Sequence, residues 1–425
     1  MNSIYSSPRS RIKVDSIGTF ASLLPVLYPF FIYYGYGSVS VSFLLATLVF
    51  IYTLVKRGSI SFEYPIAMVV YMLYFCLARV FFNLDSLHGM FSLGIVFVFL
   101  LNGFLNREVV LCYFLRFYRY IIYINIAFFF IQECLYYVLG YRIIGIMTFL
   151  PLRLGDGDFD TSQYLESASV ATRSSAFFSE PAHFVHFLLP LLVLELFYVQ
   201  NRQAYLRSCL YLAVLLALAS GNALLGVGIV GLFFILKILK RFHLGVAILF
   251  VSLFIAFSVL SVNYMLTTEY GQKMLERSEE LDSDQAQVSS GFIRIFRGYY
   301  IWDEMDSIEK IFGLNSTSKL DDKIKQSAVA LTFREGERYM NAVQSCLIYT
   351  GYIGTFIFIG LLIYLWHGNN LAGKCCLIIY VSLCFISSVY FTQTMVLYLL
   401  IALLMKRSVS GCKLQVLKIK LFHKI

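Results

Sequence analysis

The amino-acid sequence predicts an all-α polytopic membrane protein with about twelve transmembrane helices and two long non-cytoplasmic loops. Of its 425 residues, 59% are hydrophobic and 14% are charged, whereas soluble domains average about 25% charged residues. Apolar stretches of roughly 18 to 25 residues recur along the chain, and each is long enough to cross a hydrocarbon core as a helix. We therefore treat 1–425 as a single integral membrane domain.

The apolar stretches set the boundaries of the predicted spans. The pair at 208–236 is the least regular, because its halves are short and only Ser220, Gly221 and Asn222 separate them. A single re-entrant hairpin is the alternative there. The predicted spans are 17–35, 38–55, 62–82, 88–105, 120–139, 182–200, 208–221, 223–236, 244–263, 341–366, 372–388 and 389–405.

The basic residues predict the orientation, because Lys and Arg of short loops stay on the cytoplasmic side. Basic residues occur before the first span and in alternate short connections, for example at Lys56 and at Arg202 with Arg207. Both termini are then cytoplasmic, and 406–425 is a basic cytoplasmic tail. The net charge of +9 reflects this topology and an attraction to anionic membrane lipids, and it does not indicate nucleic acid binding.

Two connections, 140–181 and 264–340, are far longer than joining two helices requires. Both are rich in charges of either sign, and both fall on the non-cytoplasmic side. Within the second loop, apolar residues at helical spacing predict an amphipathic helix over 291–312, lying along the membrane surface. Arg294 and Arg297 share one face of it, where they either bind a diphosphate or extend to the interface and pair with nearby acids.

The first long loop ends at Glu180 and Pro181, directly before a predicted span. Proline suits the first position of a helix, and a carboxylate before it faces the positive end of the helix dipole. Glu180 is therefore either a helix cap or a base held at the membrane surface. His183 and His186 follow at intervals of three, and we interpret them as polar packing rather than metal ligands. We expect no metal and no other cofactor.

Charged residues inside predicted spans are few. Arg79 either extends to the interface or lines a substrate cavity, while Glu133 and Glu195 are cavity-lining candidates because burying a carboxylate in lipid is costly. The sequence has no phosphate-binding GxxxxGK[ST] loop, no HExxH and no nucleotide fingerprint. Any reaction must therefore use an activated substrate that is already in the membrane.

Three motifs resemble those of the bacterial O-antigen polymerases (Wzy type) and, more distantly, the O-antigen ligases. Residues 173–181 resemble an R-x-S/T-G-x-F-x-E-P pattern, with Ala176 at the small-residue position. The region of Arg294 and Arg297 followed by 311–315 resembles the arginine and later glycine of the large loop. Residues 341–354 resemble an H-N-x-x-L-x-x-x-x-x-G-x-x-G entry into a late helix, although the ligase histidine is replaced by Met340.

The resemblance implies a metal-independent glycosyltransferase of the bacterial cytoplasmic (inner) membrane. Its substrates would be undecaprenyl-diphosphate-linked oligosaccharide repeat units, polymerised into O-antigen or capsular polysaccharide, and a chain-length regulator protein would be a further partner. Glu180 would act as the base, and Asn341 would be a cavity-lining residue. Arginines would bind the diphosphate, because guanidinium stays charged and grips phosphate in a fork; these are Arg173, Arg294 and Arg297, with Arg334 and Arg338 as helpers.

Two alternatives have a similar architecture. An O-antigen ligase would move finished glycan onto another acceptor, and a flippase or transporter would carry lipid-linked oligosaccharide across the membrane. The long charged outer loops favour the polymerase over the flippase, which needs charges along its cavity and can function with short loops. The missing histidine before Asn341 favours the polymerase over the ligase.

Overall fold

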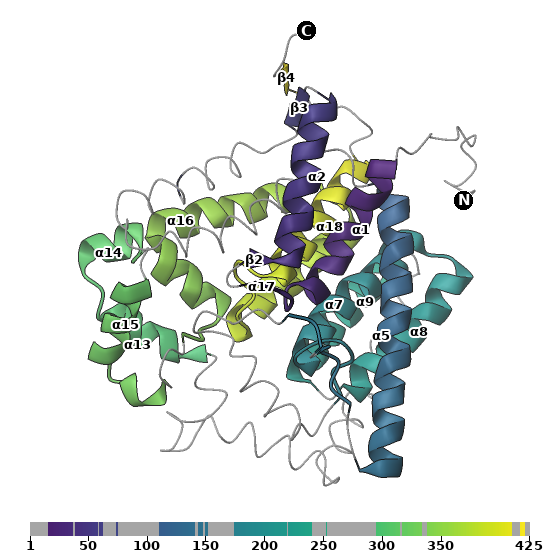
Figure 1. Ribbon diagram of the computed structural model, residues 1–425, viewed down its shortest axis with the longest axis horizontal. Coiled ribbons are helices and arrows are strands. Elements are labelled where there is room, and N and C mark those ends of the chain that lie inside the picture. The colour runs from purple at the N-terminus through teal and green to yellow at the C-terminus, as the bar shows by residue number, and fades with distance from the viewer. Residues whose placement is uncertain are drawn as a thin grey trace.

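The chain is mostly helical in the computed structural model (Figure 1). The predicted spans 62–82, 88–105 and 244–263 lie almost entirely outside the residues that it describes. The described residues are 16–36, 39–57, 59–62, 74, 110–140, 143–147, 149–151, 174–218, 220–239, 252, 295–314, 317–333, 338–409 and 417–420.

Helices occupy the other predicted spans. The first half of the chain contributes α1 (Ser16–Phe31), α2 (Val41–Arg57), α5 (Leu111–Leu139), α7 (Pro181–Leu194), α8 (Arg202–Ala217) and α9 (Gly221–Leu239). A π-helical turn, η1 (Glu195–Val199), continues α7. The second half contributes α16 (Ala342–Trp366), α17 (Leu371–Ile386) and α18 (Gln393–Val409).

Four helices of the described part of the chain are long and apolar enough to cross a membrane: α5, α7 with η1, α9 and α16. The apolar helix α17 is shorter. Helix α5 begins well before the predicted start at 120 and so includes Arg116 and Arg119. These helices support a polytopic membrane protein.

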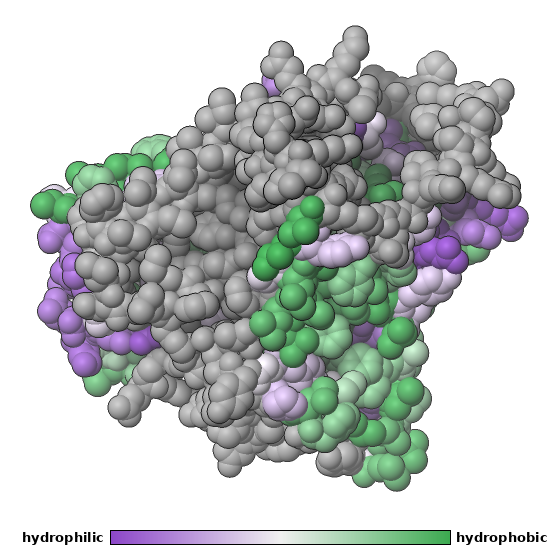
Figure 2. Space-filling model, turned by 45° about the horizontal axis from the view of Figure 1, so that its top comes forward, coloured by the Kyte–Doolittle hydropathy of each residue, from purple (hydrophilic) through white to green (hydrophobic). Residues whose placement is uncertain are grey.

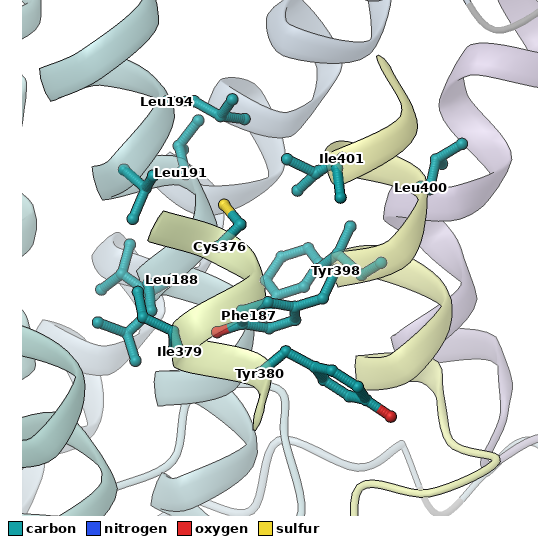
Figure 3. Close-up of a cluster of buried hydrophobic side chains, with 14 of the residues drawn as sticks. Phe187, Leu188, Leu191, Leu194, Cys376, Ile379, Tyr380, Tyr398, Leu400 and Ile401 are labelled. Carbon is teal, nitrogen blue, oxygen red and sulfur yellow. The ribbon is translucent and has the colours of Figure 1, made fainter. Parts of the chain in front are cut away.

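Helix α7 lies at the centre of the bundle. Of its apolar window, 78% is buried, against 22% for α9, and every residue from Phe184 to Leu194 is buried. A helix that is apolar all round lies either in a protein core or in lipid, and other helices cover α7. Its Phe187, Leu188, Leu191 and Leu194 share a core with residues of α17 and α18, including Cys376, Ile379, Tyr380 and Tyr398 (Figure 3).

The outer surface of the bundle is apolar as well. Along α5, large side chains such as Ile124, Phe130 and Tyr137 are exposed. Figure 2 shows hydrophobic residues spread over much of the described surface on this face, while hydrophilic residues gather at the upper right and at the left edge, where Figure 1 places α13 to α15. Soluble monomers rarely expose such continuous apolar surface, so the bundle presents it to lipid.

The predicted amphipathic helix over 291–312 is two short helices, α13 (Arg297–Asp303) and α14 (Ser307–Phe312). The break is caused by a capping box, in which Asp306 accepts a hydrogen bond from the Glu309 backbone and Glu309 accepts one from that of Asp306. Helix α15 (Thr317–Gln326) and a 3₁₀ turn, η3 (Ala330–Thr332), follow. The prediction of one continuous helix was wrong, since an Asp-x-x-Glu pattern starts a new helix.

Two short antiparallel strand pairs supplement the helices. Strands β1 (Gly35–Tyr36) and β2 (Val39–Ser40) form a turn between α1 and α2. Strand β3 (Ser59–Phe62) pairs with β4 (Leu417–Lys420), which joins the connection after α2 to the basic tail.

Candidate functional site

A polar pocket of about 270 Å³ opens at the N-terminal end of α7. It is formed where the chain enters α7 and α9, where it approaches α16, and where α17 connects to α18. Both predicted long loops contribute to it, the first through Glu180 and the second through Arg338. The remaining lining residues are Ser179, Ala182, His183, His186, Asn222, Tyr339, Ser387, Ser388, Val389, Thr392, Gln393 and Thr394.

Gln132 of α5 holds the segment before α7 in place through two hydrogen bonds. The Gln132 amide accepts a hydrogen bond from the Ala176 N–H at 2.8 Å and donates to the Ala176 carbonyl at 3.2 Å. Ala176 has a φ of 53°, in the left-handed region that favours glycine, and it is fully buried. The small residue of the 173–181 motif therefore makes a tight turn that places Ser179 and Glu180 at the pocket.

Glu180 is the N-cap residue of α7 by its extended backbone, with φ −138° and ψ 152°, and Pro181 follows at the first helical position. Its side chain makes no cap hydrogen bond, and it is exposed at the pocket. Neither a hydrogen bond nor an ion pair holds its carboxylate among the described residues. The carboxylate is therefore available to a molecule in the pocket.

His183 lies one helical turn after Glu180 and belongs to a hydrogen-bond chain that reaches Tyr33, in the turn after α1. The Tyr33 hydroxyl donates to Ser179 Oγ at 3.1 Å, and Ser179 Oγ lies 2.7 Å from His183 Nδ1. Since Tyr33 and Ser179 are buried, the chain fixes the orientation of the imidazole. His183 thus presents an oriented ring to the pocket beside the Glu180 carboxylate.

His186 forms the floor of the pocket together with Asn222 and Ser387. The Asn222 Nδ2 lies 2.9 Å from His186 Nε2 and 3.0 Å from Ser387 Oγ. Because an amide nitrogen only donates, His186 Nε2 accepts, and all three side chains are buried. This network joins α7, α9 and the end of α17, and it fixes this part of the pocket lining.

Arg338 is the basic residue of the described pocket lining. Its guanidinium forms a two-point ion pair with Asp321 of α15, with Nε to Oδ1 at 2.8 Å and Nη2 to Oδ2 at 2.9 Å. This pairing holds the planar group in one orientation. A helper arginine predicted from the second long loop thus shares a pocket with the predicted base.

Arg297 has a different role. Its side chain is fully buried, and its guanidinium donates to the Thr332 carbonyl at 3.0 Å and to the Tyr339 carbonyl. It also lies 3.7 Å from the ring centroid of Phe333. In this structure Arg297 does not line the pocket; it anchors the chain on both sides of the segment that ends at Arg338.

The late motif is explained by the architecture of α16. Asn341 is buried and caps this helix through a capping box with Gln344, and its Nδ2 donates to the Phe385 carbonyl at 3.0 Å. Gly351 has a φ of 63° and kinks α16, and a side chain there would collide with the backbone of Ile311 in α14. Gly313 of α14 is equally close to Tyr349, so α14 and α16 dock through their backbones.

The remaining predicted residues lie elsewhere. Glu133, on α5, and Asn341 are not part of the pocket lining. Arg79, Arg173, Arg294 and Arg334 lie outside the described residues. Within the described ranges, no group of three or more His, Cys, Asp or Glu side chains is arranged to hold a metal ion.

Glu195, at the far end of α7, is fully buried and paired with two arginines. Its carboxylate lies 2.5 Å from Arg119 Nε of α5 and 2.8 Å from Arg207 Nη2 of α8. The pairs join three helices through one charge. Glu195 is therefore part of a structural clamp and not of the pocket.

Sequence reasoning missed Asn222, Ser387 and Thr392, and it interpreted His183 only as polar packing. One signal was available: polar residues interrupt the apolar sequence at 387–388 and 392–394, on either side of the junction between the predicted spans 372–388 and 389–405. Comparisons of the chain with protein-family models, curated proteins and solved structures find no match. The pocket itself must therefore support any functional conclusion.

Proposed function

We propose that the chain is a polymerase of lipid-linked oligosaccharide repeat units, as its motifs suggest. It would lie in the bacterial cytoplasmic membrane with about twelve spans, cytoplasmic termini and an active site on the external side. It would transfer a growing glycan from undecaprenyl diphosphate to the non-reducing end of the next lipid-linked repeat unit. The observation that carries this proposal is the pocket in which Glu180 and Arg338, from the two long loops, come together.

The proposed step requires a base, a cation for the leaving group and an acceptor site. An acceptor sugar hydroxyl attacks the anomeric carbon of the growing chain, and its proton passes to the Glu180 carboxylate. The bond between that carbon and the diphosphate breaks, and undecaprenyl diphosphate leaves with the electron pair. Arg338 stabilises the charge that develops on it.

The other proposed diphosphate ligands lie next to described residues in the sequence. Arg173 directly precedes Ser174, and Arg334 directly follows Phe333. Arg294 lies just before α13. Arg297 supports the site indirectly, because it donates a hydrogen bond to the carbonyl of Tyr339, the residue after Arg338.

The test is a deletion strain complemented with the wild-type gene, with Arg338→Ala or with Arg202→Ala, with surface glycan examined on gels. Arg202 is an exposed arginine at the start of α8, away from the pocket. We expect the deletion and Arg338→Ala to lose the ladder of polymerised glycan while single repeat units still reach the surface. Arg202→Ala should restore the ladder, and all variants should reach wild-type protein levels.

Other outcomes identify the alternatives. Loss of single repeat units in the deletion strain would indicate a flippase. Accumulation of full-length glycan that remains lipid-linked would indicate a ligase. A normal ladder from Arg338→Ala would remove the pocket as the site of the reaction.

A further inference from the structure

A second cavity, of about 400 Å³, lies between α16 and α17. Its lining is almost wholly apolar and includes Val343, Phe358, Ile359, Leu362, Leu377 and Val381. On α17 the lining residues run from Leu377 to Phe385, which corresponds to about 12 Å of helix. The cavity is thus an elongated groove along two neighbouring helices.

The groove and the polar pocket are lined by neighbouring residues on two segments of the chain. Where the chain enters α16, Tyr339 lines the pocket and Ala342 lines the groove. At the end of α17, Ser387 lines the pocket and Phe385 lines the groove. The Ala342 N–H donates to the Ser387 carbonyl at 3.0 Å, and Asn341 Nδ2 donates to the Phe385 carbonyl at 3.0 Å. These hydrogen bonds fix the two segments at which polar lining changes to apolar lining.

This arrangement is complementary to an amphiphile. The polar head of such a molecule would lie beside Arg338. Its hydrocarbon tail would lie in the groove along α16 and α17, in contact with apolar side chains. Neighbouring helices pack about 8–10 Å apart, so a groove between one pair accommodates one chain. A phospholipid carries two acyl chains, whereas a polyprenyl lipid carries a single branched chain.

We propose that the groove between α16 and α17 binds the isoprenoid tail of the lipid-linked substrate whose diphosphate occupies the polar pocket. The identity of this head group rests on the proposed function. The tail binding does not require it, because the groove is defined by its own lining. Only the first part of a long tail fits in the groove, and the remainder lies in the bilayer.

The test is photo-crosslinking of the purified full-length chain in nanodiscs with a polyprenyl phosphate that carries a diazirine on its tail. A phospholipid with a diazirine on one acyl chain serves as the second probe. The labelled residues are mapped by mass spectrometry. We expect the polyprenyl probe to label groove residues in preference to the outer face of α16, and the phospholipid probe to label both surfaces equally.

A matched pair of variants on α16 sharpens the test. Ile359 lines the groove, whereas Phe356, one turn away, is 70% exposed and does not. Ile359→Trp fills part of the groove and should lower polyprenyl labelling about tenfold, because overfilling an apolar site is unfavourable. Phe356→Trp should leave the labelling unchanged.

Failure of this proposal differs from failure of the proposed function. Equal labelling of the groove by both probes, or unchanged labelling of Ile359→Trp, would overturn the tail site even if the glycan ladder depends on Arg338. Preferential polyprenyl labelling that Ile359→Trp abolishes would support the tail site even if the deletion strain kept its ladder. That second result would overturn only the proposed polymerase function.

Discussion

Helix α7 carries one carboxylate at each end, and the two are treated in opposite ways. Glu195 is fully buried and bound to two arginines from two other helices. Glu180 is exposed at a polar pocket, and its carboxylate has no ion pair among the described residues. Removing one partner of a buried ion pair destabilises the fold, whereas an exposed charge beside a pocket is free to act on a ligand.

The two arginines of the second long loop differ in their burial and in their contact with the pocket. Arg297 is buried with its guanidinium on two backbone carbonyls and an aromatic ring. Arg338 lines the pocket, and Asp321 fixes its orientation. One residue of each pair holds the structure together, and the other faces the pocket. The predictions below test this division by separating stability from activity.

The largest loss of stability is expected for Glu195→Ala. Removing the carboxylate leaves Arg119 and Arg207, which are mostly buried, without their partner, and breaking a buried pair in this way costs about 3–5 kcal/mol. We expect little folded protein in the membrane, measured by fluorescence-detected size exclusion after mild heating. Arg202→Ala, on the exposed side of α8, is the control. Wild-type stability of Glu195→Ala would show that the clamp is dispensable.

A smaller loss is expected for Gly351→Ala, at the kink of α16. The positive φ alone costs a non-glycine residue about 1–2 kcal/mol, and the new methyl group would also collide with the backbone of Ile311. The midpoint of thermal unfolding should fall. Gly360→Ala on the same helix is the matched control, because a side chain there meets no atom within 4 Å. Equal midpoints for the two variants would contradict the docking of α14 on α16.

Much of the helical architecture could be predicted from the sequence, because apolar runs of span length have few alternatives in lipid. The division of 291–312 was missed, although Asp306 and Glu309 carried the signal. The burial of Arg297 could not be predicted, because its carbonyl partners lie 35 and 42 residues further along the chain. Only the folded chain brings those groups together.

The site was predictable to a similar degree. Glu180 and Arg338 were identified as residues of the two long loops, and the structure brings them into one pocket. The network of His186, Asn222 and Ser387 was not predicted, because 165 residues separate the last two. Local patterns indicate caps, turns and loops, but they do not indicate which distant polar side chains meet.

Substitution of the N-cap residue of α16 tests the segment between pocket and groove. The expected loss of stability is smaller than for Gly351→Ala. Asn341→Ala removes the capping box of α16 and should cost about 1 kcal/mol of stability. Asn341→Ser keeps an acceptor for the cap without burying a charge, but it is too short to donate to the Phe385 carbonyl. Thermal unfolding of both variants separates the cap from the contact with Phe385. If Asn341→Ser is as unstable as Asn341→Ala, the contact with Phe385 is the more important one.

The smallest effect on stability, within about 0.5 kcal/mol, is expected for Glu180→Gln, because the carboxylate supports no described contact. Its effect on polymerised glycan should nevertheless be the loss of the ladder, since an amide cannot accept the acceptor proton. Glu304→Gln, on an exposed part of the second loop, should change neither property. A stable Glu180→Gln protein that still makes the ladder would show that Glu180 is not the base. The oriented His183 imidazole, one helical turn away in the same pocket, would then be the next group to substitute.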